Sequence, residues 1–391
     1  MSNCSAPCAP PPSYLFPETQ QEADIPSHLA ACHGTLRDDP AAAAPPPDAI
    51  RMQQPAGART GIAGLAGSSP RASQKRGTEY FLLPVRSILN HCTSDRVPFE
   101  WTINPYRGCE FGCRYCYARY THEFMELDGG EFESKIFVKQ NAGPILARDL
   151  AGKASRLQAS HSAAEPGRQI AIGTATDPYQ PAEREYRVTR ALLEQLADRE
   201  GLDLSITTKS NLILRDLDLL ARIAKKSSLA INLTITTLRP RLARLLEPRA
   251  PRPDLRLAAV RALRQEGLRA GVFAMPVLPG LTDRDADLEA LARAASEAGA
   301  QWLAGGVLFL MPAALKEFLP FLEDKFPKLV KGYRKWYLRN AYAPEAYRRK
   351  ISARFAALRS QFALDSRPRA AENNCTPPAP QLQLLLDVSH G

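Results

Sequence analysis

Asn104-Pro-Tyr-Arg-Gly-Cys109-Glu-Phe-Gly-Cys113-Arg-Tyr-Cys116-Tyr-Ala-Arg119 is the stretch around which the chain is organised. It places three cysteines at C-x3-C-x2-C spacing in a loop after the apolar run at residues 99–103. Three cysteines so close together in the sequence favour binding of a metal. A structural zinc site usually takes four protein ligands, whereas an iron–sulfur cluster held by three cysteines keeps one iron open. Cys92 or the adjacent His91 could add a fourth ligand, although a lone upstream cysteine more often does not.

The charge balance of the chain is basic. Its 391 residues include 51 Lys and Arg against 41 Asp and Glu, which gives a net charge of +10. This balance favours a polyanionic partner, although arginines that only solvate helices would produce it too. No apolar run reaches the roughly 18 residues of a membrane span, and the N-terminus lacks the basic start and apolar core of a signal peptide. We expect a cytoplasmic protein with no membrane partner.

Composition divides the chain into five segments. Residues 1–75 are rich in Pro and Ala and bury too little apolar surface to order, so we expect them to be disordered. A lead-in segment at 76–98 precedes the main domain at 99–311. A helical extension rich in basic and aromatic residues follows at 312–362, and a disordered tail at 363–391.

In the main domain, short β-like runs alternate with longer helical ones. The pattern predicts strands at 99–103, 170–174, 204–207, 230–235, 269–275 and 302–310, with helices near 141–153, 183–198, 212–225, 254–266 and 283–298. Strands that alternate with helices indicate a parallel sheet with right-handed helical crossovers. We therefore predict an α/β fold, a partial (β/α)6 barrel of the TIM type, with its chemistry at the carboxyl ends of the strands.

Polar residues follow the predicted strands at those ends. The relevant stretches are Gly173-Thr-Ala-Thr-Asp177, Thr207-Thr-Lys209 and Thr234-Ile-Thr-Thr237. Hydroxyls and a lysine gathered at one rim suit a ligand that carries ribose hydroxyls and a carboxylate. Threonine is also common at strand ends because of its β-propensity alone, so the prediction depends on the recurrence of the pattern.

The cysteine spacing, with Tyr115 just before the last cysteine and βα units behind it, resembles the radical S-adenosylmethionine superfamily. Within that superfamily, Thr176-Asp177, Thr207-Thr-Lys209 and Leu246-Glu-Pro248 look like the branch related to spore photoproduct lyase. The resemblance covers roughly residues 85–310. The resemblance implies that this chain is a radical enzyme of the lyase-like kind.

The resemblance also implies cofactors and their contacts. Cys109, Cys113 and Cys116 would ligate a [4Fe-4S] cluster whose open iron binds S-adenosylmethionine. An external reductant of the flavodoxin or ferredoxin type would supply the electron that cleaves this cofactor to a deoxyadenosyl radical, which abstracts hydrogen from the substrate. The residues that would contact S-adenosylmethionine are Tyr115, through its backbone, Thr176, Lys209, Thr234 and Thr236.

One residue departs from the lyase pattern. Where spore photoproduct lyase carries a cysteine that donates hydrogen to the product radical, this chain has Thr174. Its O–H bond is too strong for that step. We therefore do not expect repair of the spore photoproduct itself, whereas a related DNA or RNA substrate fits the resemblance.

The helical extension carries candidate nucleic-acid contacts. Basic residues can follow phosphates while aromatic rings stack on bases. The alternative is a helical cap on the open barrel, with its rings packed inward and its charges solvated, and both interpretations can hold together. The candidates are Arg334, Lys335, Trp336, Arg348, Arg349 and Lys350.

The tail ends in Gln381-Leu-Gln-Leu-Leu385-Leu386. The stretch from Gln381 to Leu385 resembles short peptides by which bacterial DNA-processing proteins dock on the sliding clamp, although Leu385 replaces their aromatic residue. This is a hypothesis, because such short matches also arise by chance.

Three classes of function remain open from the sequence. The first is a radical enzyme that acts on nucleic acid, and the second is a radical enzyme that acts on a protein or a small metabolite. The third is a non-catalytic protein in which the cysteines hold structural zinc or an iron–sulfur cluster. The sequence does not identify the residues that act on the substrate.

Overall fold

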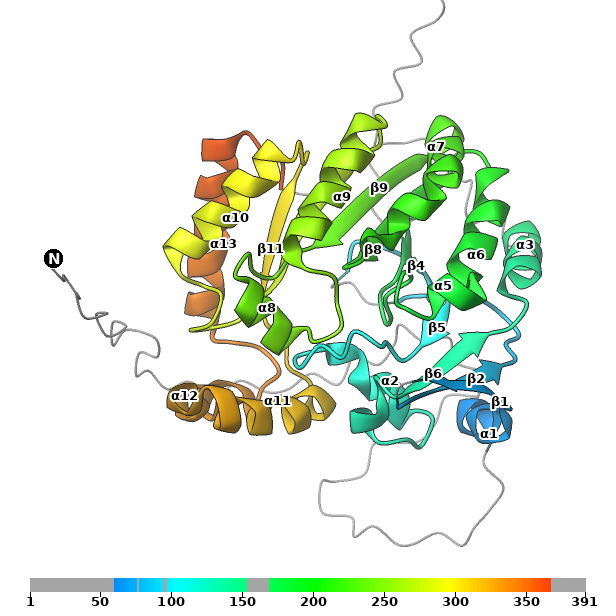
Figure 1. The fold of residues 1–391 in the computed structure, drawn as a ribbon, viewed down its shortest axis with the longest axis horizontal. Helices are drawn as coiled ribbons and strands as arrows, with labels where there is room; N and C mark the ends of the chain where they lie inside the picture. The colour runs from blue at the N-terminus through cyan, green and yellow to red at the C-terminus, as the bar shows by residue number, and fades with distance from the viewer. Residues whose placement is uncertain (1–59, 76, 94–96, 153–168, 367–391) are drawn as a thin grey trace, which may run out of the picture.

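The structure, a computed structural model, describes residues 60–75, 77–93, 97–152 and 169–366. Its main sheet has seven strands in the order β11-β10-β9-β8-β7-β4-β3 (Figure 1). The six from β4 to β11 pair in parallel, and β3 pairs antiparallel to β4 at one edge. The strands are β3 (Leu89–His91), β4 (Trp101–Ile103), β7 (Ile170–Ile172), β8 (Asp203–Thr208), β9 (Ser228–Thr234), β10 (Ala270–Val277) and β11 (Leu303–Val307). The predicted partial barrel is confirmed.

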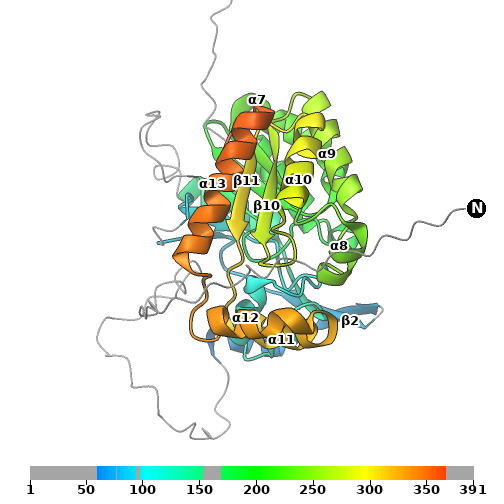
Figure 2. The ribbon, with the colours of Figure 1, turned by 90° about the vertical axis from the view of Figure 1, so that its left-hand side faces the viewer.

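Helices connect the parallel strands and cover the outer face of the sheet (Figures 1 and 2). Their leucines, isoleucines and alanines pack with those of the strands into one large core. This burial holds the strands side by side, so that their carboxyl ends meet at one edge. The helices are α3 (Ala142–Gly152), α5 (Glu183–Tyr186), α6 (Val188–Ala197), α7 (Leu217–Lys226), α9 (Pro253–Gln265) and α10 (Asp285–Glu297).

A second, four-stranded sheet lies below the carboxyl ends of the main strands in Figure 1. Its order is β1-β2-β6-β5, with β1 (Arg71–Lys75), β2 (Thr78–Leu83), β5 (Tyr106–Arg107) and β6 (Lys135–Lys139). Helix α1 (Gly61–Ser68) precedes it. The predicted disorder of residues 1–75 is therefore wrong for residues 61–75. The polar strand β1 is ordered by backbone pairing with β2, which needs no apolar side chains. Residues 1–59 lie outside the described part of the chain.

Three helices form the C-terminal region, as predicted. Helices α11 (Pro312–Lys325) and α12 (Pro327–Tyr337) lie beside the second sheet, whereas α13 (Glu345–Phe362) packs along β11 (Figure 2). The described chain runs four residues into the predicted tail, to residue 366, and Leu303 donates its amide to the Asp365 carbonyl. The clamp-like stretch from Gln381 to Leu385 lies outside the described residues. Among the described helices, none is long and apolar enough to cross a bilayer.

Candidate functional site

The cysteine loop follows β5 and is held by backbone contacts from three sides. The Cys109 amide donates to the Phe132 carbonyl at 3.0 Å, and the Arg114 amide donates to Leu246 at the end of helix α8 (Pro240–Leu246) at 2.9 Å. Gly108 has a φ of +82°, and a Cβ there would lie 2.7 Å from the Lys135 carbonyl oxygen. Only glycine fits this close approach.

A third anchor comes from the loop after β7. The Thr176 hydroxyl donates to the Gly108 carbonyl at 2.6 Å, and the Gln180 side-chain amide donates to the same oxygen at 3.1 Å. Gln180 also accepts from the Glu110 amide at 3.0 Å. Thr176 and Gln180 are buried. These two side chains therefore fix the backbone on both sides of Cys109.

The three cysteines carry free thiols in a largely apolar setting. Cys109 and Cys113 are buried and Cys116 is partly buried. Burial raises the pKa of all three thiols, and that of Cys113 to about 12 even though Lys209 opposes the shift. A buried thiol gains little from ionising alone, so a metal that binds here has to displace the proton and supply the compensating charge.

The number of thiols fits an iron–sulfur cluster better than a zinc ion. A structural zinc site usually takes four protein ligands, whereas an iron–sulfur cluster held by three cysteines keeps one iron open. Among the described residues, no three His, Cys, Asp or Glu side chains come close enough together to hold one metal ion. The assignment of the three cysteines to a [4Fe-4S] cluster stays a proposal.

The suggested fourth ligand lies elsewhere. His91 pairs with Trp101, and the Cys92 amide donates to the Glu100 carbonyl at 2.7 Å, so both residues lie at the amino end of β4. The cysteine loop follows the carboxyl end of the same strand. The prediction that Cys92 or His91 could complete the ligand set is wrong.

Lys209, after β8, points toward the cysteine loop. Its ammonium lies 5.8 Å from the centre of the Tyr115 ring and 4.0 Å from the Glu247 carboxylate. Burial lowers the pKa of Lys209, but the neighbouring Cys113 and the Glu247 carboxylate outweigh this and raise it. Lys209 therefore stays protonated beside the cysteines, and its side chain is 17% exposed, which leaves the cation accessible to a ligand.

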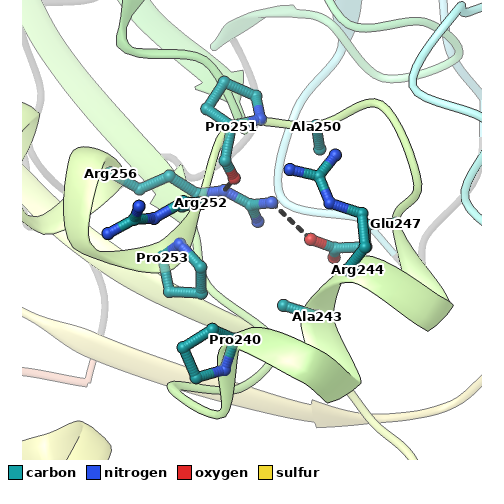
Figure 3. Close-up of a pocket in the computed structure, with 9 residues that line it drawn as sticks. All are labelled: Pro240, Ala243, Arg244, Glu247, Ala250, Pro251, Arg252, Pro253 and Arg256. Carbon is teal, nitrogen blue, oxygen red and sulfur yellow. Dashed lines mark hydrogen bonds and ion pairs between the residues drawn. The ribbon is translucent and has the colours of Figure 1, made fainter.

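Glu247 is the centre of a buried polar network that the sequence did not predict. Its carboxylate accepts hydrogen bonds from the Tyr115 hydroxyl and, at 2.8 Å, from the Thr236 hydroxyl. Arg256 pairs with the other carboxylate oxygen (Figure 3) and donates to the Thr234 carbonyl at 3.0 Å. The network thus joins Tyr115 and the end of β9 to helices α8 and α9.

The two cations of this network share one carboxylate. Burial alone would raise the pKa of Glu247, but Arg256, Lys209 and the Tyr115 hydrogen bond lower it to about 2. The carboxylate is therefore ionised. It holds Arg256 and Lys209 in place and keeps the Tyr115 hydroxyl engaged, which leaves the Tyr115 backbone to face a ligand.

The predicted cofactor residues gather at this edge of the sheet. Tyr115, Thr176, Thr234 and Thr236 are buried. Lys209 joins them through Asp177, whose carboxylate accepts from the Lys209 amide at 2.7 Å and from the Thr208 hydroxyl at 2.6 Å. The structure thus brings the predicted rim together. The roles that we assign to these residues stay proposals.

The predicted nucleic-acid residues differ in exposure. Trp336 is 7% exposed and packs 5.0 Å from the Tyr347 ring, so its predicted stacking role is wrong. Its aromatic neighbours on α12 are buried as well, which agrees with the helical cap. The predicted cations Arg334, Lys335, Arg348, Arg349 and Lys350 are all exposed. Arg334 pairs with Glu323 at 2.6 Å, and Arg349 pairs with Glu345 at 3.2 Å.

Three important residues were missed. Glu247 belongs to the Leu246-Glu-Pro248 pattern, but nothing in the sequence predicted a role for it. From the sequence, Arg256 is one of several arginines on a predicted helix, and Gln180 is one polar residue in a predicted loop. Each acts only because α8, α9 or the loop after β7 packs against the cysteine loop.

Comparisons with known proteins agree with this site. A family model described as Radical SAM superfamily matches residues 103–292. An uncharacterised protein of Mycobacterium tuberculosis is 35% identical over 308 residues, covering 78% of this chain and 87% of that protein. An uncharacterised protein of Methanocaldococcus jannaschii is 31% identical over 185 residues, covering 47% of this chain and 62% of that protein.

Solved structures share the fold. A spore photoproduct lyase variant superposes with a TM-score of 0.53 at 17% identity, covering 79% of this chain and 85% of that chain. Another variant, at 15% identity and the same TM-score and coverage, was solved with bound AdoMet and dinucleoside spore photoproduct. At these identities the likeness concerns the fold alone. With the family match and the curated relatives, it supports one conclusion: the chain belongs to the radical S-adenosylmethionine superfamily.

Proposed function

We propose that this protein is a radical S-adenosylmethionine enzyme that acts on a nucleic-acid substrate. The observation that carries the proposal is the setting of the three cysteines. Two of them are buried and one is partly buried, at the carboxyl ends of six parallel strands, with the protonated Lys209 beside them. Membership of the superfamily supports the same chemistry.

In this proposal Cys109, Cys113 and Cys116 hold a [4Fe-4S] cluster. When bound, the cluster and S-adenosylmethionine supply a deoxyadenosyl radical that abstracts hydrogen from the substrate. Lys209 offers a cation for the carboxylate of the cofactor, and the threonines at positions 176, 234 and 236 offer polar contacts. Tyr115 contributes its backbone, because its hydroxyl is held by Glu247 and Thr236.

The chain's own residues also limit the access of water. Apolar side chains of the cysteine loop pack with those of α11 and α12 in a single cluster. Its core includes Phe111, Phe132, Phe318, Tyr333 and Leu310. This wall separates the cysteines from solvent on one side, and exclusion of water protects reactive species.

The nucleic-acid part of the proposal has two supports. The net charge of +10 favours a polyanion, and a structural relative was solved with dinucleoside spore photoproduct. Thr174 separates the two proteins. Its side chain bonds to Asn104 at 3.1 Å and offers no thiol to a product radical, so we propose a lesion or modified nucleotide other than the spore photoproduct.

Three further assignments belong to this proposal. The protein would take its electron from a flavodoxin or ferredoxin in the cytoplasm. The tail from Gln381 to Leu385 would dock on the sliding clamp. Equal retention of the clamp by intact and tail-deleted protein in a pull-down would remove that last assignment.

The decisive experiment is anaerobic reconstitution with iron and sulfide, followed by dithionite and S-adenosylmethionine. We expect about four irons per chain and release of 5′-deoxyadenosine, stimulated by DNA or RNA over protein and small-molecule fractions of a cell extract. The Cys113→Ala variant is the control and should lose both the cluster and the cleavage.

Several outcomes would contradict the proposal. A tightly bound zinc ion with no cofactor cleavage would favour a structural metal site. If only protein or metabolite fractions stimulate release of 5′-deoxyadenosine, the substrate is not a nucleic acid. Cleavage by Cys113→Ala with an intact cluster would overturn the assignment of the loop.

A further inference from the structure

Two cations share one face of the second sheet. Strands β5 and β6 pair antiparallel, with Arg107 opposite Phe137. Side chains two residues apart on a strand point to the same face, so Lys139 lies diagonally across from Arg107. The backbone of Lys139 is tied to the same turn, because its amide donates to the Pro105 carbonyl at 3.3 Å.

This pair has no counter-ion among the residues that the structure describes. Lys139 is 6% exposed and Arg107 is partly exposed. Among the described residues, no carboxylate acts on either cation, and neither side chain makes a hydrogen bond or ion pair within that part of the chain. Burial and the like charge of Arg107 lower the pKa of Lys139 to about 7, so that Lys139 is only partly protonated at neutral pH until an anion binds.

A buried, unpaired pair of like charges costs stability. Taking one ion out of water costs several kcal/mol in a protein unless a partner compensates. The Glu247 network shows how this chain pairs a buried cation when pairing is structural, since Arg256 has its carboxylate 2.5 Å away. Arg107 and Lys139 have no such partner within the described part of the chain, which suits a site that an external anion completes.

The pair lies beside the edge where the strands end. Asn104, which precedes the Pro105 turn, bonds to the Thr174 hydroxyl at 3.1 Å and accepts from the Ala175 amide at 2.8 Å. Arg107 also lies near Tyr120. The cations that act most strongly on the cysteine thiols are different ones, namely Lys209, Arg119 and Arg256. The pair is thus next to the proposed active site but apart from the cluster ligands.

Aromatic rings lead from this pair across the strand ends. Tyr117 is 41% exposed and lies 6.5 Å from Tyr120 on one side and 6.4 Å from Phe309 on the other. Phe309 lies 4.7 Å from Tyr342, and Arg348 lies 5.5 Å above the Tyr342 ring. We call Tyr120, Tyr117, Phe309 and Tyr342 the aromatic row. It has cations at both ends.

We propose that Arg107 and Lys139 bind a phosphodiester of the nucleic-acid substrate, whose neighbouring bases stack along the aromatic row. The substrate class rests on the proposed function. Cations that hold phosphates beside rings that stack bases are the recognised means of binding single-stranded nucleic acid. The row passes over Thr174, whose carbonyl accepts from the Tyr117 hydroxyl, so a strand bound here crosses the strand ends next to the cluster loop.

The test measures binding rather than turnover. Anaerobically reconstituted, full-length protein is titrated with a fluorescent single-stranded 12-nucleotide DNA at 50 to 300 mM salt. The variant Arg107→Gln/Lys139→Met is compared with Arg261→Gln/Lys225→Gln, which removes equal charge from exposed positions on α9 and α7. We expect the first variant to bind about tenfold more weakly at 0.15 M salt, with a log–log salt slope shallower by about 1.4, because each single-strand phosphate contact contributes about 0.7. The control should stay within twofold of the wild type.

Stability separates a binding role from a structural one. At pH 6, below the Lys139 pKa of about 7, Lys139→Met removes an unpaired buried charge, so it should raise Tm of the unliganded protein while it weakens binding if Lys139 is kept for a ligand. A fall in Tm would mean that Lys139 supports the fold. Unchanged DNA affinity and salt slope in the double variant would overturn the proposal.

Two further arms identify the ligand. The variant Tyr117→Leu should bind the 12-mer at least fivefold more weakly, whereas Tyr117→Phe should keep the affinity, because stacking needs the ring. An abasic 12-mer should be insensitive to Tyr117→Leu but sensitive to the double variant. If inorganic phosphate or a mononucleotide competes at equal concentration with the 12-mer, the site holds a free anion and the strand assignment fails.

The outcome distinguishes this proposal from the proposed function. Wild-type protein that cleaves S-adenosylmethionine but binds no DNA or RNA would end the nucleic-acid assignment. If the wild type binds the 12-mer and the double variant binds it with the same affinity, only the assignment of Arg107 and Lys139 fails.

Discussion

At the scale of single residues, Glu247 is the strongest structural test of the site. Its carboxylate is 2% exposed and lies between Arg256 and Lys209. Replacement by Gln removes the negative charge and leaves two cations facing one another in a dry environment. We expect Glu247→Gln to lower the free energy of unfolding by about 3 kcal/mol, as for other broken buried ion pairs. Urea unfolding of the unreconstituted protein measures this.

The same carboxylate gives a pH dependence of known sign. Its pKa is about 2 in the folded protein, below the ordinary value of 4.5. Its stabilisation is therefore full above pH 4.5 and is lost as pH falls toward 2. The stability difference between wild type and Glu247→Gln should stay constant from pH 5 to 8 and shrink below pH 4.5. If the stability difference between wild type and Glu247→Gln stays constant down to pH 3, the lowered pKa of Glu247 is contradicted. Glu200→Gln, at an exposed ion pair, is the matched control and should cost under about 1 kcal/mol.

Thr176 tests how the loop is positioned. Its hydroxyl donates to the Gly108 carbonyl and accepts from Gln180 at 3.0 Å. Thr176→Val keeps the shape but removes both bonds, and we expect a loss of about 1 to 3 kcal/mol of stability. The iron bound per chain, measured before S-adenosylmethionine is added, should fall as well. Thr176→Ser keeps the hydroxyl and should load normally. Full iron loading of the Val variant would show that the loop does not depend on this anchor.

At the scale of elements, the strands of the main sheet were predictable because each is a short apolar run between helical stretches. The second sheet was not. Strand β5 has two residues, and β1 reads Arg-Ala-Ser-Gln-Lys. Both are held by backbone pairing, β1 with the next strand of the chain and β5 with β6, and this pairing leaves no apolar pattern in the sequence. The site divides in the same way: the cysteine spacing is local and readable, whereas Glu247 and Arg256 meet only when α8 and α9 pack.

Helix α13 carries the remaining prediction about an element. Arg348, Arg349 and Lys350 are exposed at its start, while Ile351 and Phe355 bury the opposite side. Reversal of the three charges to Glu should leave Tm nearly unchanged and weaken DNA binding, with a salt slope shallower by about 2 if all three meet phosphates. If affinity and slope do not change, α13 serves only as a cap on β11 and the row ends at Tyr342.

At the scale of the whole molecule, the cysteine loop lies where separate parts of the fold meet. Thr176 from the main sheet, Phe132 before β6, and Leu246 of α8 each bond to it, and α11 packs against it through Phe318. A ligand bound by the three cysteines therefore couples elements that are far apart in the sequence. Binding to the folded state alone stabilises it by mass action.

We expect anaerobic reconstitution to raise Tm and to slow amide hydrogen exchange in residues 108–119 and also at 132–139 and 240–247, because these segments share hydrogen bonds with the loop. Exchange in α7, on the outer face of the sheet, should not change and serves as the internal control. Hydrogen-exchange mass spectrometry of wild type and Cys113→Ala, before and after reconstitution, measures both. Protection confined to the loop, or equal protection in Cys113→Ala, would show that the bound cluster does not tie these elements together.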